Sequence, residues 1–168
     1  MAKIFQTSDD IVDLADEIFS TTGLPQLGIN LKVMSLTKSK DVLKVSKANA
    51  TTEFLTKNSD MVTLYVYEEA FDRLNDEQKR KLMEGVLSNV SYDTEREKLN
   101  IDNSRYGEAI RMRRKYSDYG DIIETSVLVI EEIQEEEKQR KEEEKERKAA
   151  ERAARKAGKL KNNRMNRT

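Results

Sequence analysis

The side chains that carry out most enzyme chemistry are missing from this chain of 168 residues, which has no His and no Cys. Their absence excludes Ser-His and Cys-His catalysis, imidazole-ligated metals, thiolate chemistry and disulfides. The sequence also has no Gly-rich phosphate loop, so nucleotide hydrolysis has no support. We therefore predict that the protein is not an enzyme and uses no cofactor.

One group of carboxylates has the types and spacing that a hard metal ion would need. Glu68, Glu69 and Asp72 lie within five residues of each other. Such a run is more typical of a solvated helix start, where the positive end of the helix dipole favours negative charge. We predict a helix start there and no metal site.

The segment that follows these carboxylates predicts an amphipathic helix from residue 76 through Val90. Asn75 and Gln78 have the spacing of a capping box. The apolar residues recur at helical spacing and would pack on a sheet; they are Leu82, Met83, Val86, Leu87 and Val90.

This helix and its neighbours resemble a phage-encoded metallopeptidase family whose members carry a His-Glu-x-x-His helix after a strand. The resemblance rests on the order of VTLYVYEEAF, DRLNDEQKRKLMEGVLSNVSYD, KLNID and RKYSDYG. The resemblance covers about residues 29–120. The same part of the chain is also similar to small conserved proteins of crAss-like bacteriophages. The resemblance implies a zincin-like α/β fold.

The zinc motif itself is lost from this chain. Gly85 stands for the first His, Val86 for the Glu and Asn89 for the second His. Because a zinc site needs ligands at i and i+4 and a general base beside the first, the resemblance implies an inactive relative. An ordinary amphipathic helix without such ancestry is the alternative. Gly85 either permits a close approach of helix and sheet or marks the degenerate site.

Two basic segments are candidates for binding. The first combines cations with tyrosines, as nucleic-acid surfaces do for phosphate contact and stacking. Its candidate cations are Arg111, Arg114 and Lys115, and its tyrosines are Tyr106, Tyr116 and Tyr119. We favour the alternative explanation, a tyrosine stripe that faces the core beside a solvated basic face.

The second basic segment is the end of the chain. Its candidate binding residues are Arg152, Arg155, Lys156, Lys159, Lys161, Arg164 and Arg167. The first four lie at i, i+3, i+4 and i+7, so they share one side of a helix and could follow a row of phosphates. A solubilising helix end or a dock for an acidic protein is the alternative.

The charge of the chain is unevenly distributed, with an acidic body and a basic C-terminal end, which favours a negatively charged partner for that end. Residues 138–168 hold 13 Lys or Arg and 5 Asp or Glu, whereas residues 1–137 hold 18 and 27. An acidic body with a basic tail indicates binding to a nucleic acid or to an acidic protein surface.

The remaining pattern predicts a small α/β (α+β) domain over residues 1–120, a mixed sheet with packed helices. We expect a helix that starts after Thr7 or Ser8 and ends before Gly23. Strands are expected over residues 29–36, up to Val45, over 61–67 as a central strand, and over 98–102 at an edge. Further helices are expected over about residues 48–55 and 104–116.

A long charged helix is expected over residues 121–160, followed by a flexible basic end over residues 161–168. Beyond Ile133 the helix has no apolar stripe, and sustained heptads are missing, so we predict no coiled coil. Pairs at i,i+4, each worth about 0.2–0.5 kcal/mol, would support it in solvent. They are Glu136–Arg140, Glu137–Lys141, Glu143–Arg147, Glu144–Lys148 and Glu151–Arg155.

The sequence has no apolar stretch of membrane-spanning length and no signal-peptide segment at its start. We therefore expect the host cytoplasm or a virion, without secretion or membrane binding. The leading hypothesis is a non-catalytic bacteriophage protein that binds nucleic acid or a protein partner through its surface and basic helix. The alternative is a virion structural or packaged component whose C-terminal helix tethers it to phage assembly partners.

Overall fold

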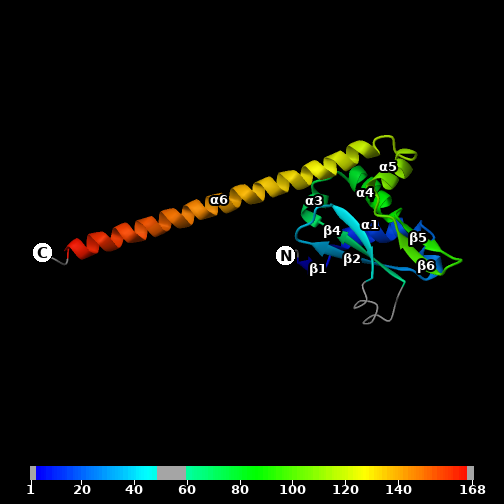
Figure 1. The fold of residues 1–168 in the computed structure, drawn as a ribbon, viewed down its shortest axis with the longest axis horizontal. Coiled ribbons are helices and arrows are strands. Elements are labelled where there is room, and N and C mark those ends of the chain that lie inside the picture. The colour runs from blue at the N-terminus through cyan, green and yellow to red at the C-terminus, as the bar shows by residue number, and fades with distance from the viewer. Residues whose placement is uncertain (1–2, 49–59, 166–168) are drawn as a thin grey trace. The chain divides into compact units, whose positions relative to one another are not determined.

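The structure is a computed structural model that describes the backbone of residues 3–48 and 60–165 and the side chains as far as Lys156. It has a mixed α/β fold with small sheets and a long C-terminal helix, which confirms the predicted class (Figure 1). The chain divides into two compact units, Met1–Ile130 and Glu131–Thr168. The first unit therefore extends ten residues past the boundary predicted at residue 120.

The main sheet has four strands in the order β1 (Ile4–Phe5), β2 (Asn30–Leu36), β4 (Met61–Val66) and β3 (Leu43–Lys47). β2 and β4 are parallel, and β1 and β3 run antiparallel to their neighbours. Five of the six residues of β4 are buried, as a strand covered on both faces requires. The prediction of a central strand is confirmed.

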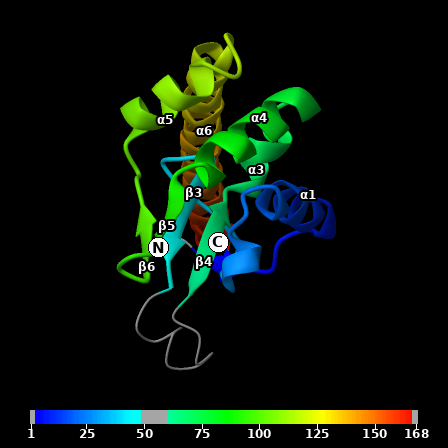
Figure 2. The same ribbon diagram turned by 90° about the vertical axis from the view of Figure 1, so that its right-hand side faces the viewer.

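Two helices pack against each other and against this sheet. α1 (Asp9–Ser20) contacts β2, and α4 (Asp76–Leu87) contacts β3 (Figure 2). The N-cap of α1 is Ser8, and two aspartates occupy its first turn, as the sequence predicts. Its buried face consists of Ile11, Ala15, Ile18 and Phe19.

Two short elements connect these parts. The 3-10 helix η1 (Pro25–Leu27) ends at Gly28, whose φ of 81° is left-handed and suits glycine. α3 (Glu68–Asp72) begins with acidic residues, so the predicted helix start is confirmed. Glu68 accepts hydrogen bonds from the Ser8 N–H at 2.9 Å and the Ser35 hydroxyl at 2.5 Å. This carboxylate joins the start of α1 to β2.

α4 begins with the predicted capping box but ends earlier than predicted. Asn75 Oδ1 accepts from the Gln78 N–H at 2.8 Å, and Gln78 Oε1 accepts from the Asn75 N–H at 3.1 Å. The helix ends at Leu87, where the Ser88 hydroxyl caps the Gly85 carbonyl at 2.6 Å. The predicted extension through Val90 is wrong.

Val90 instead begins a second, separate sheet. β5 (Val90–Asp93) pairs antiparallel with β6 (Lys98–Ile101) in a sheet of two strands. β6 is therefore an edge strand, as predicted, although it belongs to this second sheet and not to the main one. The side chain of Val90 is buried from a strand position, which is why an apolar residue three positions after Leu87 gave a false helical signal.

Two further helices complete the described chain. α5 (Arg105–Arg113) begins at Ser104, whose hydroxyl accepts the Gly107 N–H at 3.1 Å. α6 (Tyr119–Met165) starts two residues before the predicted start and includes residues 161–165, which the sequence assigned to a flexible end. Ile122, Val129 and Ile130 of α6 are buried. The helix expected over about residues 48–55 lies outside the described residues apart from its first position.

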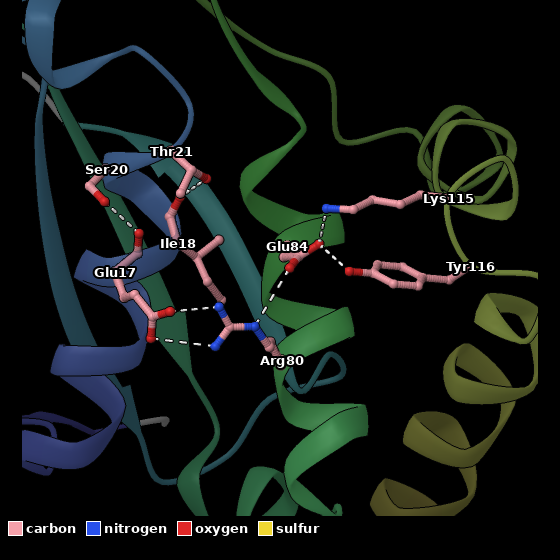
Figure 3. A network of polar contacts seen from close by, with 8 residues as sticks. All are labelled: Glu17, Ile18, Ser20, Thr21, Arg80, Glu84, Lys115 and Tyr116. Carbon is pink, nitrogen blue, oxygen red and sulfur yellow. Dashed lines mark hydrogen bonds and ion pairs between the residues drawn. The ribbon is translucent and has the colours of Figure 1, made fainter.

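A network of charged side chains holds the connection between α5 and α6 against α4 (Figure 3). Glu84 accepts hydrogen bonds from Lys115 Nζ at 2.7 Å and from the Tyr116 hydroxyl at 2.9 Å. Arg80 Nε lies 3.8 Å from Glu84 Oε1, and Arg80 Nη2 lies 2.6 Å from Oε1 of Glu17 in α1. The network therefore spans three segments that are far apart in the sequence.

Candidate functional site

Asn89, which aligns with the second His of the resembled zinc motif, lies in a buried polar cluster. Its Nδ2 donates to Glu108 Oε2 at 2.6 Å, and its Oδ1 accepts from the Arg111 guanidinium. The Tyr119 hydroxyl donates to Glu108 Oε1 at 2.5 Å. The exposed fractions are 6% for Asn89, 7% for Glu108 and 0% for Tyr119. We call these four residues the Glu108 cluster.

Gly85 is the position at which the Glu108 cluster meets α4. A Cβ atom on Gly85 would lie 1.7 Å from the Tyr119 hydroxyl oxygen, a distance that no real contact allows. The close approach that Gly85 permits is therefore to a side chain of α6 and not to the sheet. Val86, which the resemblance places at the Glu of the motif, is buried with 6% of its surface exposed.

The electrostatics of the cluster keep its hydrogen bonds in place. Burial, and then the negative charge of Glu108, raise the pKa of Tyr119 far above its ordinary value near 10. Tyr119 therefore stays protonated and remains a donor. On the exposed side, a backbone N–H of Ser104 and the Arg111 guanidinium lower the pKa of Asp102. Arg111 thus connects Asp102, at 3.3 Å, to Asn89.

A cavity of about 110 Å³ adjoins this cluster. Glu108 and Asn89 line it from α5 and the end of α4. Its apolar lining includes Val45, Leu82, Val86, Ile123, Val127 and Ile130. Asp41 and Arg105, which form an ion pair, also contribute to the lining. Polar and apolar side chains line this space in similar numbers, and Glu108 is its buried carboxylate.

The three positions compared with the zinc motif are unsuited to zinc. Gly85 and Val86 have no side-chain donor atom, and the side-chain oxygen of Asn89 already accepts from Arg111. Within residues 3–48 and 60–156, no group of three or more His, Cys, Asp or Glu could hold a metal ion. The arrangement holds the Glu108 carboxylate between two hydrogen-bond donors, Asn89 and Tyr119.

The first basic segment is largely occupied by contacts within the unit Met1–Ile130. Arg111 bonds Asn89 and Asp102, and Lys115 bonds Glu84. Arg114 is exposed. The preferred explanation, a tyrosine stripe that faces the core, fits Tyr119, which is fully buried, but does not fit Tyr106, which is 78% exposed.

The second basic segment lies on α6. Arg152, Arg155 and Lys156 are exposed, and Lys159, Lys161 and Arg164 belong to the helix. Arg167 lies outside the described residues. The predicted ion pairs Glu137–Lys141 and Glu144–Lys148 form, at 3.3 Å and 2.5 Å.

A shallow groove on one face of α6 brings basic residues together. We call it the basic groove; its lining consists of Lys145, Lys148, Ala149, Arg152, Ala153 and Lys156. Sequence reasoning missed Lys145 and Lys148, although they precede Arg152 by seven and four residues and so share its helical side.

Comparison of the chain with protein-family models, with curated proteins and with solved structures found no match. The zincin-like relationship therefore stays a prediction from the order of elements. Within the described residues, no helix has both the length and the apolar character needed to cross a bilayer.

Proposed function

We propose that the protein acts by binding and not by catalysis, and that the basic groove of α6 binds double-stranded nucleic acid. The observation that supports the proposal is that four cationic side chains and two alanines line one shallow groove along α6. The small alanines keep this side of the helix narrow, so the longer cationic side chains can reach phosphates on either side of the helix axis.

The dimensions support this arrangement. The groove extends from Lys145 to Lys156, which is about 17 Å at 1.5 Å per residue. A DNA duplex carries one negative charge per roughly 1.7 Å, so about ten phosphates lie along that length. A helix about 10–12 Å wide also fits the major groove of about 12 Å.

The charge balance of this end of α6 also supports it. Residues 147–168 hold nine Lys or Arg and a single acid, Glu151. Lys148 pairs with Glu144, whereas Lys145, Arg152 and Lys156 have no ion-pair partner among the residues that the structure describes. These cations can replace the counterions of a nucleic acid without breaking a bond within the protein.

Two double variants with the same change in net charge test the proposal. Arg152→Gln with Lys156→Gln removes two cations of the basic groove. Arg140→Gln with Arg147→Gln removes two exposed cations of the same helix that do not line it. Glutamine is a good helix former, so helicity by circular dichroism should be retained in both.

The measurement is the salt dependence of binding to a DNA duplex and to an RNA duplex. For the groove variant we expect a slope of log affinity against log salt that is shallower by about 1.8, from about 0.9 per lost phosphate contact. The control variant should stay close to the wild type. Equal losses in the two variants would mean a diffuse charge effect, and no binding by the wild-type protein at low salt would end the proposal.

We further propose that this binding takes place in a phage-infected cell, and the resemblance to phage proteins supports this setting. The alternative role, a virion component held by its C-terminal helix, predicts that the protein is present in purified particles. Mass spectrometry of particles separates the two roles, because a protein acting only in the host cytoplasm would be absent from them.

A further inference from the structure

The cavity beside the Glu108 cluster is lined by a buried carboxylate that forms no ion pair with Lys40, Lys44 or Arg105, which line the same cavity. Glu108 is 93% buried, and among the described residues no basic side chain lies within ion-pair distance of it. The nearest guanidinium of the cluster, that of Arg111, is bonded to Asn89 and Asp102 instead. A buried carboxylate without a paired cation is unfavourable unless other groups compensate for it.

The carboxylate also has unused hydrogen-bonding capacity. An ionised carboxylate offers about four acceptor positions. Asn89 and Tyr119 each occupy one, on different oxygens of Glu108. Glu108, which lines the cavity, can therefore accept a further hydrogen bond from a ligand.

The walls determine which cation would suit this space. Val45, Leu82 and Val127 form the apolar part of the lining, and an aliphatic chain on the ligand would contact them. The cations that line it, Lys40, Lys44 and Arg105, are exposed, and solvent screens their repulsion. The acid Asp41 pairs with Arg105. The volume of about 110 Å³ limits the ligand to a few heavy atoms.

We propose that the cavity between β3, α4, α5 and the first turns of α6 is a binding site for a primary ammonium group on a short aliphatic chain. The ammonium donates to Glu108, and the chain contacts the apolar walls. A free alkylamine and the end of a lysine side chain share this chemistry. The site lies within Met1–Ile130 and does not depend on nucleic-acid binding by α6.

Titration calorimetry with four small probes tests the proposal on the full chain. n-Butylammonium should bind with a Kd on the order of millimolar, as expected for so few atoms. n-Butanol, the neutral analogue, and butyrate, the anionic one, should bind at least tenfold more weakly. N-acetyl-lysine amide distinguishes the two sources: binding like butylammonium favours a lysine side chain, and weaker binding favours a free amine.

Two variants separate the charge from the space. Glu108→Gln removes the charge, and Val127→Phe fills the cavity without altering Glu108; each should raise the Kd of butylammonium at least tenfold. Leu128→Ala changes a neighbouring residue that is 51% exposed and does not line the cavity, so the Kd should stay unchanged. Thermal unfolding verifies that each variant is folded, and if Glu108→Gln is not, Val127→Phe decides alone.

Three results would overturn the proposal. The first is an absence of saturable binding of butylammonium at concentrations ten times the expected Kd. The second is equal affinity for butylammonium and butanol, which would indicate an apolar cavity without a role for Glu108. The third is wild-type affinity in folded Val127→Phe, which would place the ligand elsewhere.

Discussion

Gly85 and Tyr119 illustrate how one position can depend on another 34 residues away. The hydroxyl of Tyr119 occupies the space in which any other side chain at position 85 would begin. That hydroxyl must reach Glu108, because otherwise a buried carboxylate would lose one of its two donors. The glycine thus serves the hydrogen bonds of the Glu108 cluster, even though glycine weakens a helix interior by about 1 kcal/mol.

Gly85→Ala should therefore destabilise the protein, against the trend of helix propensity. Overpacking costs about 1–3 kcal/mol and the gain in propensity is about 1 kcal/mol, so we expect a net loss of up to about 2 kcal/mol in the free energy of urea unfolding. In a Tyr119→Leu background the hydroxyl is gone, and most of this loss should disappear. A stabilising Gly85→Ala in the wild-type protein would contradict the explanation.

Between elements, ion pairs fix the connection of α5 and α6 to α4. Lys81 of α4 lies 2.7 Å from Asp118, which directly precedes α6, and 2.6 Å from Glu77. The ammonium of Lys81 also lies 5.0 Å from the centre of the Tyr116 ring. Single exposed pairs contribute little, but several contacts on one lysine restrict where α6 begins.

The pH dependence of stability should report on this contact. The hydrogen bond from Lys81 lowers the pKa of Asp118 in the folded protein. The unfolded chain, with an Asp pKa of about 3.9, then binds more protons in acid, so the stabilisation is present above about pH 4 and lost as pH falls through the folded pKa.

Asp118→Asn should therefore lower the melting temperature at neutral pH and have a smaller effect in acid. The effect should be small and should weaken with added salt, because the Asp118 side chain is 48% exposed. Thermal unfolding from neutral to acidic pH measures it. In a Lys81→Gln background the pH-dependent part should vanish, and its persistence would assign it to another partner.

Elements defined by local signals were predictable from the sequence, and those defined by distant contacts were not. The capping residues Asn75 and Gln78 predict the start of α4, and the apolar run of β4 predicts a strand; both signals lie within a few positions of the chain. Val90 was assigned to the helix because its spacing from Leu87 suits a helix, whereas its strand position depends on pairing with the distant Ile101. The Glu108 cluster was missed because its members come from three segments. Its one local signal is Glu108 itself, which lies one helical turn before the buried Met112.

At the scale of the whole molecule, the first compact unit ends at Ile130 and so includes the first residues of α6. A domain ending at residue 120 would lack Ile122, Val129 and Ile130, which are 3%, 8% and 5% exposed. Burial of such side chains contributes about 1.5–3 kcal/mol each, and their sum is comparable to the 5–15 kcal/mol that stabilises a typical domain. The first turns of α6 are therefore part of the core.

Two truncations test this boundary. A chain that ends at residue 120 should show no cooperative thermal transition in its near-ultraviolet tyrosine signal. A chain that ends at residue 137 keeps every buried side chain described for α6 and should melt within a few degrees of the full-length protein. Similar melting of the two truncated chains would show that the core is complete without α6.

The pairing of the main sheet has a consequence for the order in which the chain acquires structure. Ile4 pairs with Leu36, and Asn30 pairs with Met61, so each strand must await a partner made much later in synthesis. Sheets with such high contact order form in about milliseconds or longer, whereas a helix about 20 residues long equilibrates within roughly a microsecond. When the whole chain refolds from the denatured state, the basic end of α6 depends on neighbouring residues alone, so it can become helical before the sheet has formed.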